Sequence, residues 1–201
     1  MQSKSLTKML TASAAVFALA ACAPDTDVDD ANDSAAAVAA PTVDSAAGTT
    51  MGAAMTEANV FAALAASNAA EIEHSKVAVD KATNADVKAF AQMMIDEHTA
   101  MAKQGDELAV RLNVTPAPND VANELRDEST KDVNDLTAKT GADLDKEYID
   151  EQIDMHQETL DLLDRLDDNA TNADLKAMIE QAKPKVQQHL DRAKAIKEKL
   201  G

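Results

Sequence analysis

The apolar residues of this chain recur every three or four positions over most of its length, which is the spacing of one face of an α-helix. Turn-forming residues interrupt this period at four places after residue 56. The pattern predicts an up-down bundle of four long helices and one shorter, more polar connecting helix. The expected ranges are 57–82, 85–112, 120–138, 142–167 and 173–200, with the connecting helix third.

Two of the predicted breaks have almost the same sequence. Residues 83–89 read Thr-Asn-Ala-Asp-Val-Lys-Ala, and residues 171–177 read Thr-Asn-Ala-Asp-Leu-Lys-Ala. Each Asn is a good N-cap for the helix that follows, and each short break joins two helices into a hairpin. The echo indicates either duplication of a two-helix unit or convergence on a favourable turn. The two turns can lie at the same end of the bundle or at opposite ends.

Three of the apolar seams carry one histidine each, at a position where an apolar residue is expected. His98, His156 and His189 stand on the second, fourth and fifth predicted helices, and Glu71 borders the seam of the first. Counted from the nearest predicted cap at about 1.5 Å per residue, these four side chains fall at a similar level. We therefore expect one buried polar layer.

Three imidazoles and a carboxylate at one level suit a single transition-metal ion, which can be Zn, Fe, Mn, Cu or Ni. The alternative is a metal-free hydrogen-bonded network that fixes the register of the helices. His74, three residues after Glu71, lies off the layer, and we expect it to be a peripheral ligand at best. Asp96 and Glu97 precede His98 and are expected in solvent or in an outer shell.

Composition narrows the classes of fold and function. Only 2% of the residues are aromatic, which disfavours an all-β fold, and the predicted fold class is all-α. The 36 acidic side chains against 19 basic ones give a net charge of −17, which argues against a nucleic-acid partner. There is no glycine-rich phosphate loop and no nucleophile elbow, so we predict no catalytic residue and favour a non-enzymatic role.

The N-terminal residues have the features of an export signal. Residues 1–21 carry two lysines, no acidic residue and an apolar stretch too short to span a bilayer as a helix. The stretch ends in Leu-Ala-Ala-Cys at residues 19–22, which resembles the lipobox of bacterial lipoproteins. The resemblance implies cleavage before Cys22 and lipidation of that residue. The alternative is an ordinary secretory signal with an incidental Cys22.

Residues 22–55 are acidic and have no sustained apolar period, which predicts a disordered tether. The expected organisation is therefore a signal peptide (1–21), a tether that begins at the lipidated cysteine (22–55) and a helical domain (56–201). We expect the domain to face the periplasm, with its lipid anchor, in the outer membrane, as its only membrane contact.

Residues 61–72 and 87–98 resemble the bacterial ferritin-like family called domain of unknown function 4142. The second stretch reads Val-Lys-Ala-Phe-Ala-Gln-Met-Met-Ile-Asp-Glu-His, and that family usually has Asp directly before the His. Further matches include Tyr148, His156 and His189, and the similarity covers roughly residues 60–200. The resemblance implies a ferritin-like bundle in a cell-envelope protein and carries no established activity.

The chain departs from di-iron ferritins at three positions. Those proteins place a Glu three residues before a His on two helices. Here the residues three before the seam histidines are Ile95, Ile153 and Val186. A ferroxidase centre is therefore not expected, and a mononuclear site is the better metal hypothesis.

We predict a cell-envelope lipoprotein with a periplasmic ferritin-like helical domain of unestablished role, in which the His/Glu layer is a candidate site for one metal ion. One alternative is a metal-dependent oxidoreductase that oxidises ferrous iron or handles peroxide. The other is a metal-free structural module whose acidic surface meets a basic protein partner.

Overall fold

The computed structural model describes residues 55–201, which form five α-helices and no strand. The all-α prediction is confirmed for this part of the chain. The helices are α1 (Glu57–Lys81), α2 (Ala85–Arg111), α3 (Asp120–Thr137), α4 (Gly141–Asn169) and α5 (Ala173–Leu200). Each boundary lies within two residues of its predicted place. The predicted signal peptide, Cys22 and the tether up to residue 54 lie outside the described residues.

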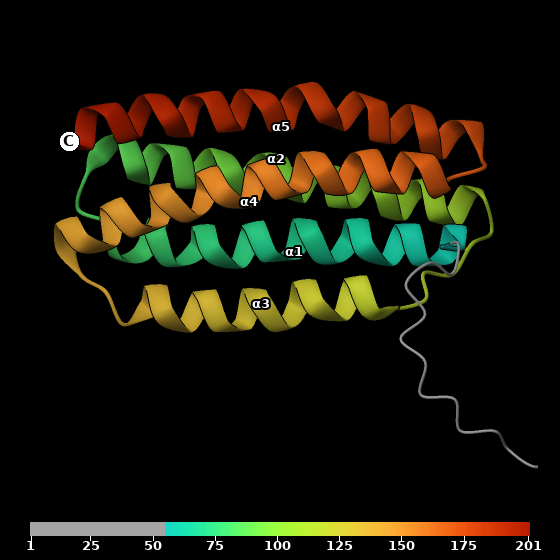
Figure 1. Cartoon of the computed structure of the whole chain (residues 1–201), viewed down its shortest axis with the longest axis horizontal. Coiled ribbons are helices and arrows are strands. Elements are labelled where there is room, and N and C mark those ends of the chain that lie inside the picture. Colours follow the sequence, from blue (N-terminus) through green and yellow to red (C-terminus); the bar gives the residue numbers. More distant parts are fainter. Residues whose placement is uncertain (1–54) are drawn as a thin grey trace, which may run out of the picture. The chain divides into compact units, whose positions relative to one another are not determined.

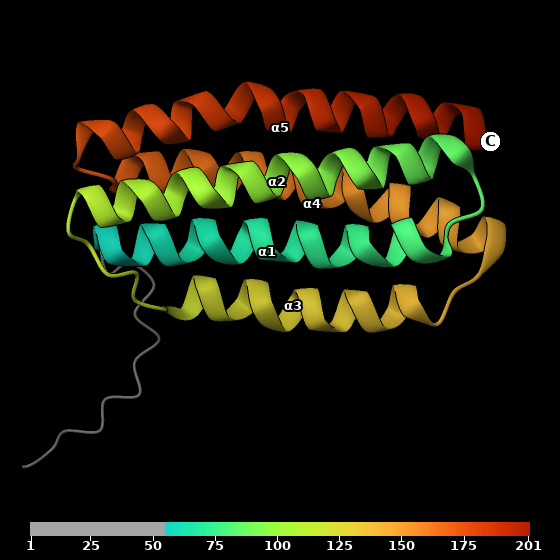
Figure 2. The ribbon, with the colours of Figure 1, turned by 180° about the vertical axis from the view of Figure 1, so that it is seen from behind.

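Successive helices run in opposite directions (Figure 1). The α1–α2 turn and the α4–α5 turn lie at opposite ends, because α3 carries the chain back along α1 before α4 begins. Figure 2 shows the same order from behind, with α3 outermost. The topology that the helix lengths left open is therefore the one with turns at opposite ends. No helix among residues 55–201 is long and apolar enough to cross a membrane.

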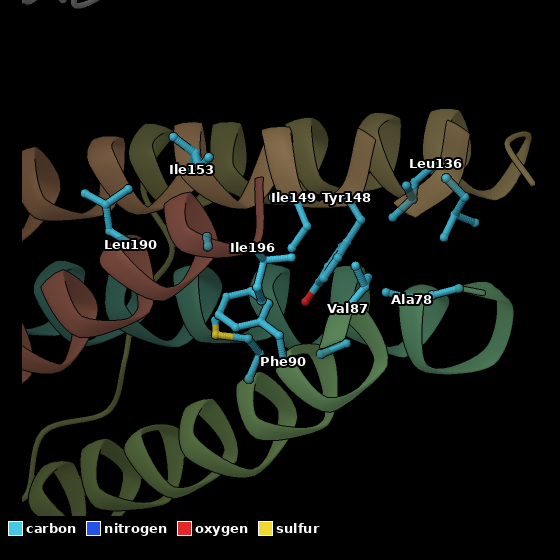
Figure 3. Close-up of a cluster of buried hydrophobic side chains, with 14 residues drawn as sticks. Ala78, Val87, Phe90, Leu136, Tyr148, Ile149, Ile153, Leu190 and Ile196 are labelled. Atoms are coloured by element: carbon cyan, nitrogen blue, oxygen red, sulfur yellow. The ribbon is translucent and has the colours of Figure 1, made fainter. Parts of the chain in front are cut away.

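The described core contains two large apolar clusters, with a polar layer between them along each long helix, and a small third cluster of alanines where α1 meets α3. The first cluster includes Val87, Phe90 and Tyr148 and lies toward the α1–α2 turn (Figure 3). The second includes Phe61 and Leu175 and lies toward the α4–α5 turn. Apart from Asp145, which lies beside the α1–α2 turn, the buried polar residues lie between the two groups or at their border in the sequence of each helix. This layer holds every buried polar side chain of the described core except Asp145.

Both hairpin turns are held by a carboxylate from the other hairpin. Asp145 of α4 accepts hydrogen bonds from the backbone N–H groups of Thr83 and Asn84 at 2.9 and 3.0 Å, and from the Thr83 hydroxyl at 2.6 Å. The predicted cap at this turn is confirmed. The Asn84 side chain accepts hydrogen bonds from the backbone N–H groups of Asp86 and Val87 and so fixes the start of α2.

The second turn repeats this arrangement. Glu57, the first residue of α1, accepts hydrogen bonds from the backbone N–H groups of Thr171 and Asn172 and from the Thr171 hydroxyl. Asn172 in turn accepts from the backbone N–H groups of Asp174 and Leu175 and so caps α5. Each hairpin thus fixes the turn of the other.

Candidate metal centre

Three imidazoles from three helices meet in the polar layer. His98 of α2, His156 of α4 and His189 of α5 are buried, each with at most 2% of its surface exposed. One nitrogen of each ring lies within 4.8 Å of the corresponding nitrogen of the other two. The ring centroids are 5.3 to 5.9 Å apart. The seam positions therefore bring the three histidines together.

The hydrogen bonds on the outer side of His98 fix its tautomer. Its Nδ1 lies 3.0 Å from the side-chain oxygen of Asn68. That amide cannot be turned around without loss, because its nitrogen donates to the backbone oxygen of Leu64 at 2.9 Å. His98 Nδ1 must therefore carry the hydrogen and donate it, and the lone pair is left on Nε2.

The other two rings follow the same rule. His156 Nδ1 lies 2.7 Å from the backbone oxygen of Gln152, which can only accept a hydrogen bond. His189 Nε2 lies 3.0 Å from a carboxylate oxygen of Glu97. Each of these nitrogens donates, so the lone pairs are on His156 Nε2 and His189 Nδ1. Outer partners that hold each imidazole in one tautomer are typical of metal-bound histidines.

The three remaining nitrogens are buried and have no hydrogen-bond partner in the structure: His98 Nε2, His156 Nε2 and His189 Nδ1. All three are acceptors, and none can donate to another. A single water molecule has two hydrogens and so satisfies at most two of them. One metal cation satisfies all three, because each lone pair becomes a coordinate bond. Bonds of about 2.1 Å would draw the nitrogens closer, to roughly 3.4 Å.

Burial keeps the His98 and His189 rings neutral, which metal binding requires. Desolvation lowers the pKa of His98 to about 4 despite the nearby carboxylate of Glu71. Desolvation also lowers the pKa of His189, although the hydrogen bond to Glu97 opposes it. At neutral pH both rings therefore offer a lone pair rather than a positive charge.

Glu71 is buried beside the group and is not one of its three converging ligands. One carboxylate oxygen accepts a hydrogen bond from the Gln152 amide at 2.8 Å. The other, Oε1, has no hydrogen-bond partner and lies 3.5 Å from His156 Nδ1, on the side of the ring away from its free nitrogen. Burial raises the pKa of Glu71, but His156, His98 and Gln152 outweigh it and lower the pKa overall. The geometry gives Glu71 an outer place.

His74 lies apart from the three-histidine group. It is fully buried, and its Nδ1 is 3.7 Å from a carboxylate oxygen of Glu151 on α4. Desolvation lowers the pKa of His74, and burial with nearby acidic groups raises the pKa of Glu151 to about 7. This pair is a separate buried polar contact.

Two residues that surround the histidines, Gln152 and Glu97, differ in how far the sequence alone could identify them. Gln152 is absent from the sequence prediction, although it stands one helical turn before His156 and so shares its face. Glu97 adjoins His98 in sequence but contacts His189 on another helix. The expectation of an outer-shell place for Glu97 fits this contact, but its partner follows only from how α2 and α5 pack.

Two cavities flank the polar layer. The first, of about 150 Å³, is mainly apolar and is lined by His98, Asn68, Met101 and Ala182 among others. The second is a cleft of about 530 Å³ whose wall includes Glu71 and residues of α1, α3 and α4. The centre therefore has an apolar space on one side and a polar cleft on another.

The model of the family described as domain of unknown function (DUF4142) matches residues 40–196. The chain belongs to this family. Comparison with curated proteins and with solved structures found no similar chain. The match extends over all five helices as far as residue 196 and includes every residue of the three-histidine group.

Proposed function

We propose that this DUF4142 protein binds one transition-metal ion through His98, His156 and His189. The observation that carries the proposal is the set of three buried lone pairs, each fixed by an outer hydrogen bond and none with a partner. A metal-free network leaves at least one of these acceptors unsatisfied even with a water between them, at a cost of about 1–3 kcal/mol. This asymmetry favours a cation over the structural alternative.

The donor set narrows the ion. Neutral imidazole suits Zn, Cu, Ni and Fe, whereas Mn prefers oxygen ligands. The two carboxylates beside the outer nitrogens, Glu71 at His156 and Glu97 at His189, balance the charge of a divalent ion. Carboxylates in this position also raise the basicity of the ligating nitrogen. We therefore expect a divalent ion of the zinc or iron type.

The metal-dependent oxidoreductase is the second candidate, and the apolar cavity favours it. Three protein ligands leave a coordination position for a further ligand. The cavity of about 150 Å³ that His98 lines is large enough for a small neutral molecule such as peroxide. Oxidation of ferrous iron by peroxide, slowed when Ala182→Met fills the cavity, would support this activity. Unchanged turnover in that variant would count against it.

We also infer a ferritin-like topology and a place in the cell envelope. Ferritin-like bundles join two antiparallel hairpins through one long crossover, and here α3 is the crossover between the α1–α2 and α4–α5 hairpins. Residues 19–22 support lipidation at Cys22, and Ala23 directly after that cysteine, in place of Asp, supports a periplasm-facing, outer-membrane location. Mass spectrometry of the chain purified from membranes would detect the lipid. An unmodified thiol on Cys22 would remove the anchor from the proposal.

Elemental analysis of residues 23–201 exported by their own host tests the metal. We expect one equivalent of a transition metal in the unaltered chain and none in His98→Val. His74→Leu is the matched control, because it removes a buried histidine outside the group and should keep the metal. A metal-free unaltered chain whose melting temperature does not change with Zn, Fe, Mn, Cu or Ni would support the metal-free structural module instead.

A further inference from the structure

The cleft on the α3 side exists because α3 packs closely along α1 and only touches α4. The walls of the resulting space, about 530 Å³, come from α1, α3 and α4. Among residues 55–201, no second crossover helix fills the corresponding place on the other side of the bundle (Figure 1). The cleft is thus specific to the side of the bundle on which Glu71 lies.

The charged residues that line the cleft are nearly all acidic. Its acidic residues are Glu71, Glu124, Glu128, Asp132, Glu158 and Asp161, against the single basic residue Arg165. Among the described residues, only Asp132 of the six forms an ion pair with a lysine or arginine. Burial raises the pKa of Glu158, and the nearby Glu128 raises it further, as expected for carboxylates that face one another. The walls therefore create a strongly negative potential.

A buried carboxylate oxygen at the inner end of the cleft points to a ligand. Glu71 lines the cleft, has 1% of its surface exposed, and its Oε1 has no hydrogen-bond partner. The same oxygen lies 3.5 Å from Nδ1 of His156, whose other nitrogen is one of the three free ligands. One imidazole ring therefore separates the innermost carboxylate of the cleft from the candidate metal centre.

We propose that this acidic cleft is the route by which a divalent cation enters, with Glu71 as its last carboxylate before the three histidines. The proposal rests on the metal-binding function inferred above. A cleft of one charge sign focuses its field and raises the on-rate of an oppositely charged ligand by about 10- to 1,000-fold, in a salt-dependent way. The cavity on the other side of the layer is mainly apolar, and its charged lining residues are one acid, Asp106, and one lysine, Lys185. It therefore lacks the excess of negative charge that would attract a hydrated cation.

Stopped-flow mixing of the metal-free chain with Co²⁺ tests the route, because histidine-bound Co²⁺ has a ligand-field absorption that reports arrival at the centre. We expect the double variant Glu128→Gln/Asp161→Asn to slow uptake about tenfold at low salt and to flatten its salt dependence. Its final spectrum should be that of the unaltered chain. Glu71→Gln should slow uptake at least as much.

Two matched variants separate the route from general charge and from the other cavity. Asp127→Asn/Asp168→Asn removes the same charge from α3 and α4 at exposed positions outside the cleft and should change the uptake rate less than about twofold. Ala182→Met fills the apolar cavity and should leave the rate unchanged. Wild-type rates in the cleft variants, or slow uptake in Ala182→Met alone, would overturn the route while leaving the metal centre intact. Absence of the Co²⁺ spectrum in the unaltered chain would instead remove the metal centre itself.

Discussion

The α1–α2 and α4–α5 hairpins are built to the same plan, and they differ most in the layer where the histidines lie. A shift of 88 residues carries Asn84, the cap of α2, onto Asn172, the cap of α5. The same shift carries Glu57 onto Asp145, and these are the two carboxylates that hold the turns. The resemblance therefore extends well beyond the seven residues of the turns.

Ion pairs between α2 and α5 obey the same shift. Arg111 pairs with Asp174 at 3.3 Å, and Lys199 pairs with Asp86 at 2.9 Å, at the other end of the helices. Convergence on a good cap explains the turn sequences. It gives no reason for matched carboxylate anchors and basic ion-pair partners that each lie 27 residues from a capping asparagine. Of the two explanations for the echo, the structure favours duplication of a two-helix unit.

In the polar layer the two halves no longer match. Under the 88-residue shift, Asn68 is the equivalent of His156 and Met101 is the equivalent of His189. The second and third ligands therefore both come from the α4–α5 hairpin. His98 corresponds to Val186, which is apolar. The contacts at the two ends of the bundle are therefore matched between the hairpins. The middle layer is asymmetric, with one histidine from the first hairpin and two from the second.

The apolar cavity has a cause in the same comparison. Ala182 and Ala102 line it, and the 88-residue shift relates them to Met94 and Leu190, which belong to the apolar cluster toward the α1–α2 turn. Smaller side chains at these two positions leave space beside His98. The cavity is therefore a difference between the two ends of the bundle, to which each hairpin contributes one alanine.

The largest expected effect comes from binding of a metal ion to the three histidines of the polar layer. With free metal at a thousand times its dissociation constant, the folded chain should gain about 4 kcal/mol in its free energy of unfolding. His98→Val, which copies the residue of the other half, should abolish the gain, and His74→Leu should keep it. Chemical denaturation with and without metal measures both. An equal gain in His98→Val would mean that the metal binds elsewhere.

Acid should act through the same layer in the metal-free chain. His98 takes up a proton near pH 6.5 when unfolded but only near pH 4 when folded. Its contribution is therefore complete above pH 6.5 and is lost as the pH falls toward 4, by up to about 3 kcal/mol at 1.36 kcal/mol per pKa unit. Urea denaturation with a chelator should give a shallower decline in His98→Val. Identical pH profiles would contradict the assignment.

The two turn anchors should differ in strength because they differ in burial. Asp145 has 3% of its surface exposed, whereas Glu57 is partly exposed. Asp145→Ala removes a buried acceptor from three donors and leaves apolar surroundings in its place, so it should cost about 3 kcal/mol of stability. Glu57→Ala, where water can replace the carboxylate, should cost about 1 kcal/mol. Thermal unfolding of the two variants makes the comparison. Equal losses would show that burial does not set the strength of the anchor.

The smallest effect is expected at the exposed ion pairs. Removing Arg111 or Lys199 by alanine substitution should each lower stability by less than about 0.5 kcal/mol, since exposed pairs are screened by water and salt. The double variant should be additive because the pairs lie at opposite ends. A loss above about 1 kcal/mol in either single variant, measured by denaturant unfolding, would give these contacts a larger part in joining the hairpins.

The helices, their caps and the meeting of the three histidines could be predicted because each depends on spacing along one helix. Asn84 and Asn172 mark helix starts, and the seam positions of the histidines set their direction. The precise place of Glu71 depends on how α1 is rotated about its axis relative to α4. The spacing of residues along α1 does not determine this rotation to better than a fraction of a helical turn. The path of α3, and with it the acidic cleft, depends on packing between helices that share no turn.

The reciprocal turn contacts have a consequence for the origin of the chain. Glu57 reaches the turn of the second hairpin, and Asp145 reaches the turn of the first. Two identical helical hairpins, placed head to tail, would satisfy both contacts and both terminal ion pairs at once. The bundle therefore resembles a symmetric dimer of hairpins whose two subunits are joined by α3 into one polypeptide. Because the two hairpins are encoded separately, equivalent positions can carry different residues, as they do in the polar layer.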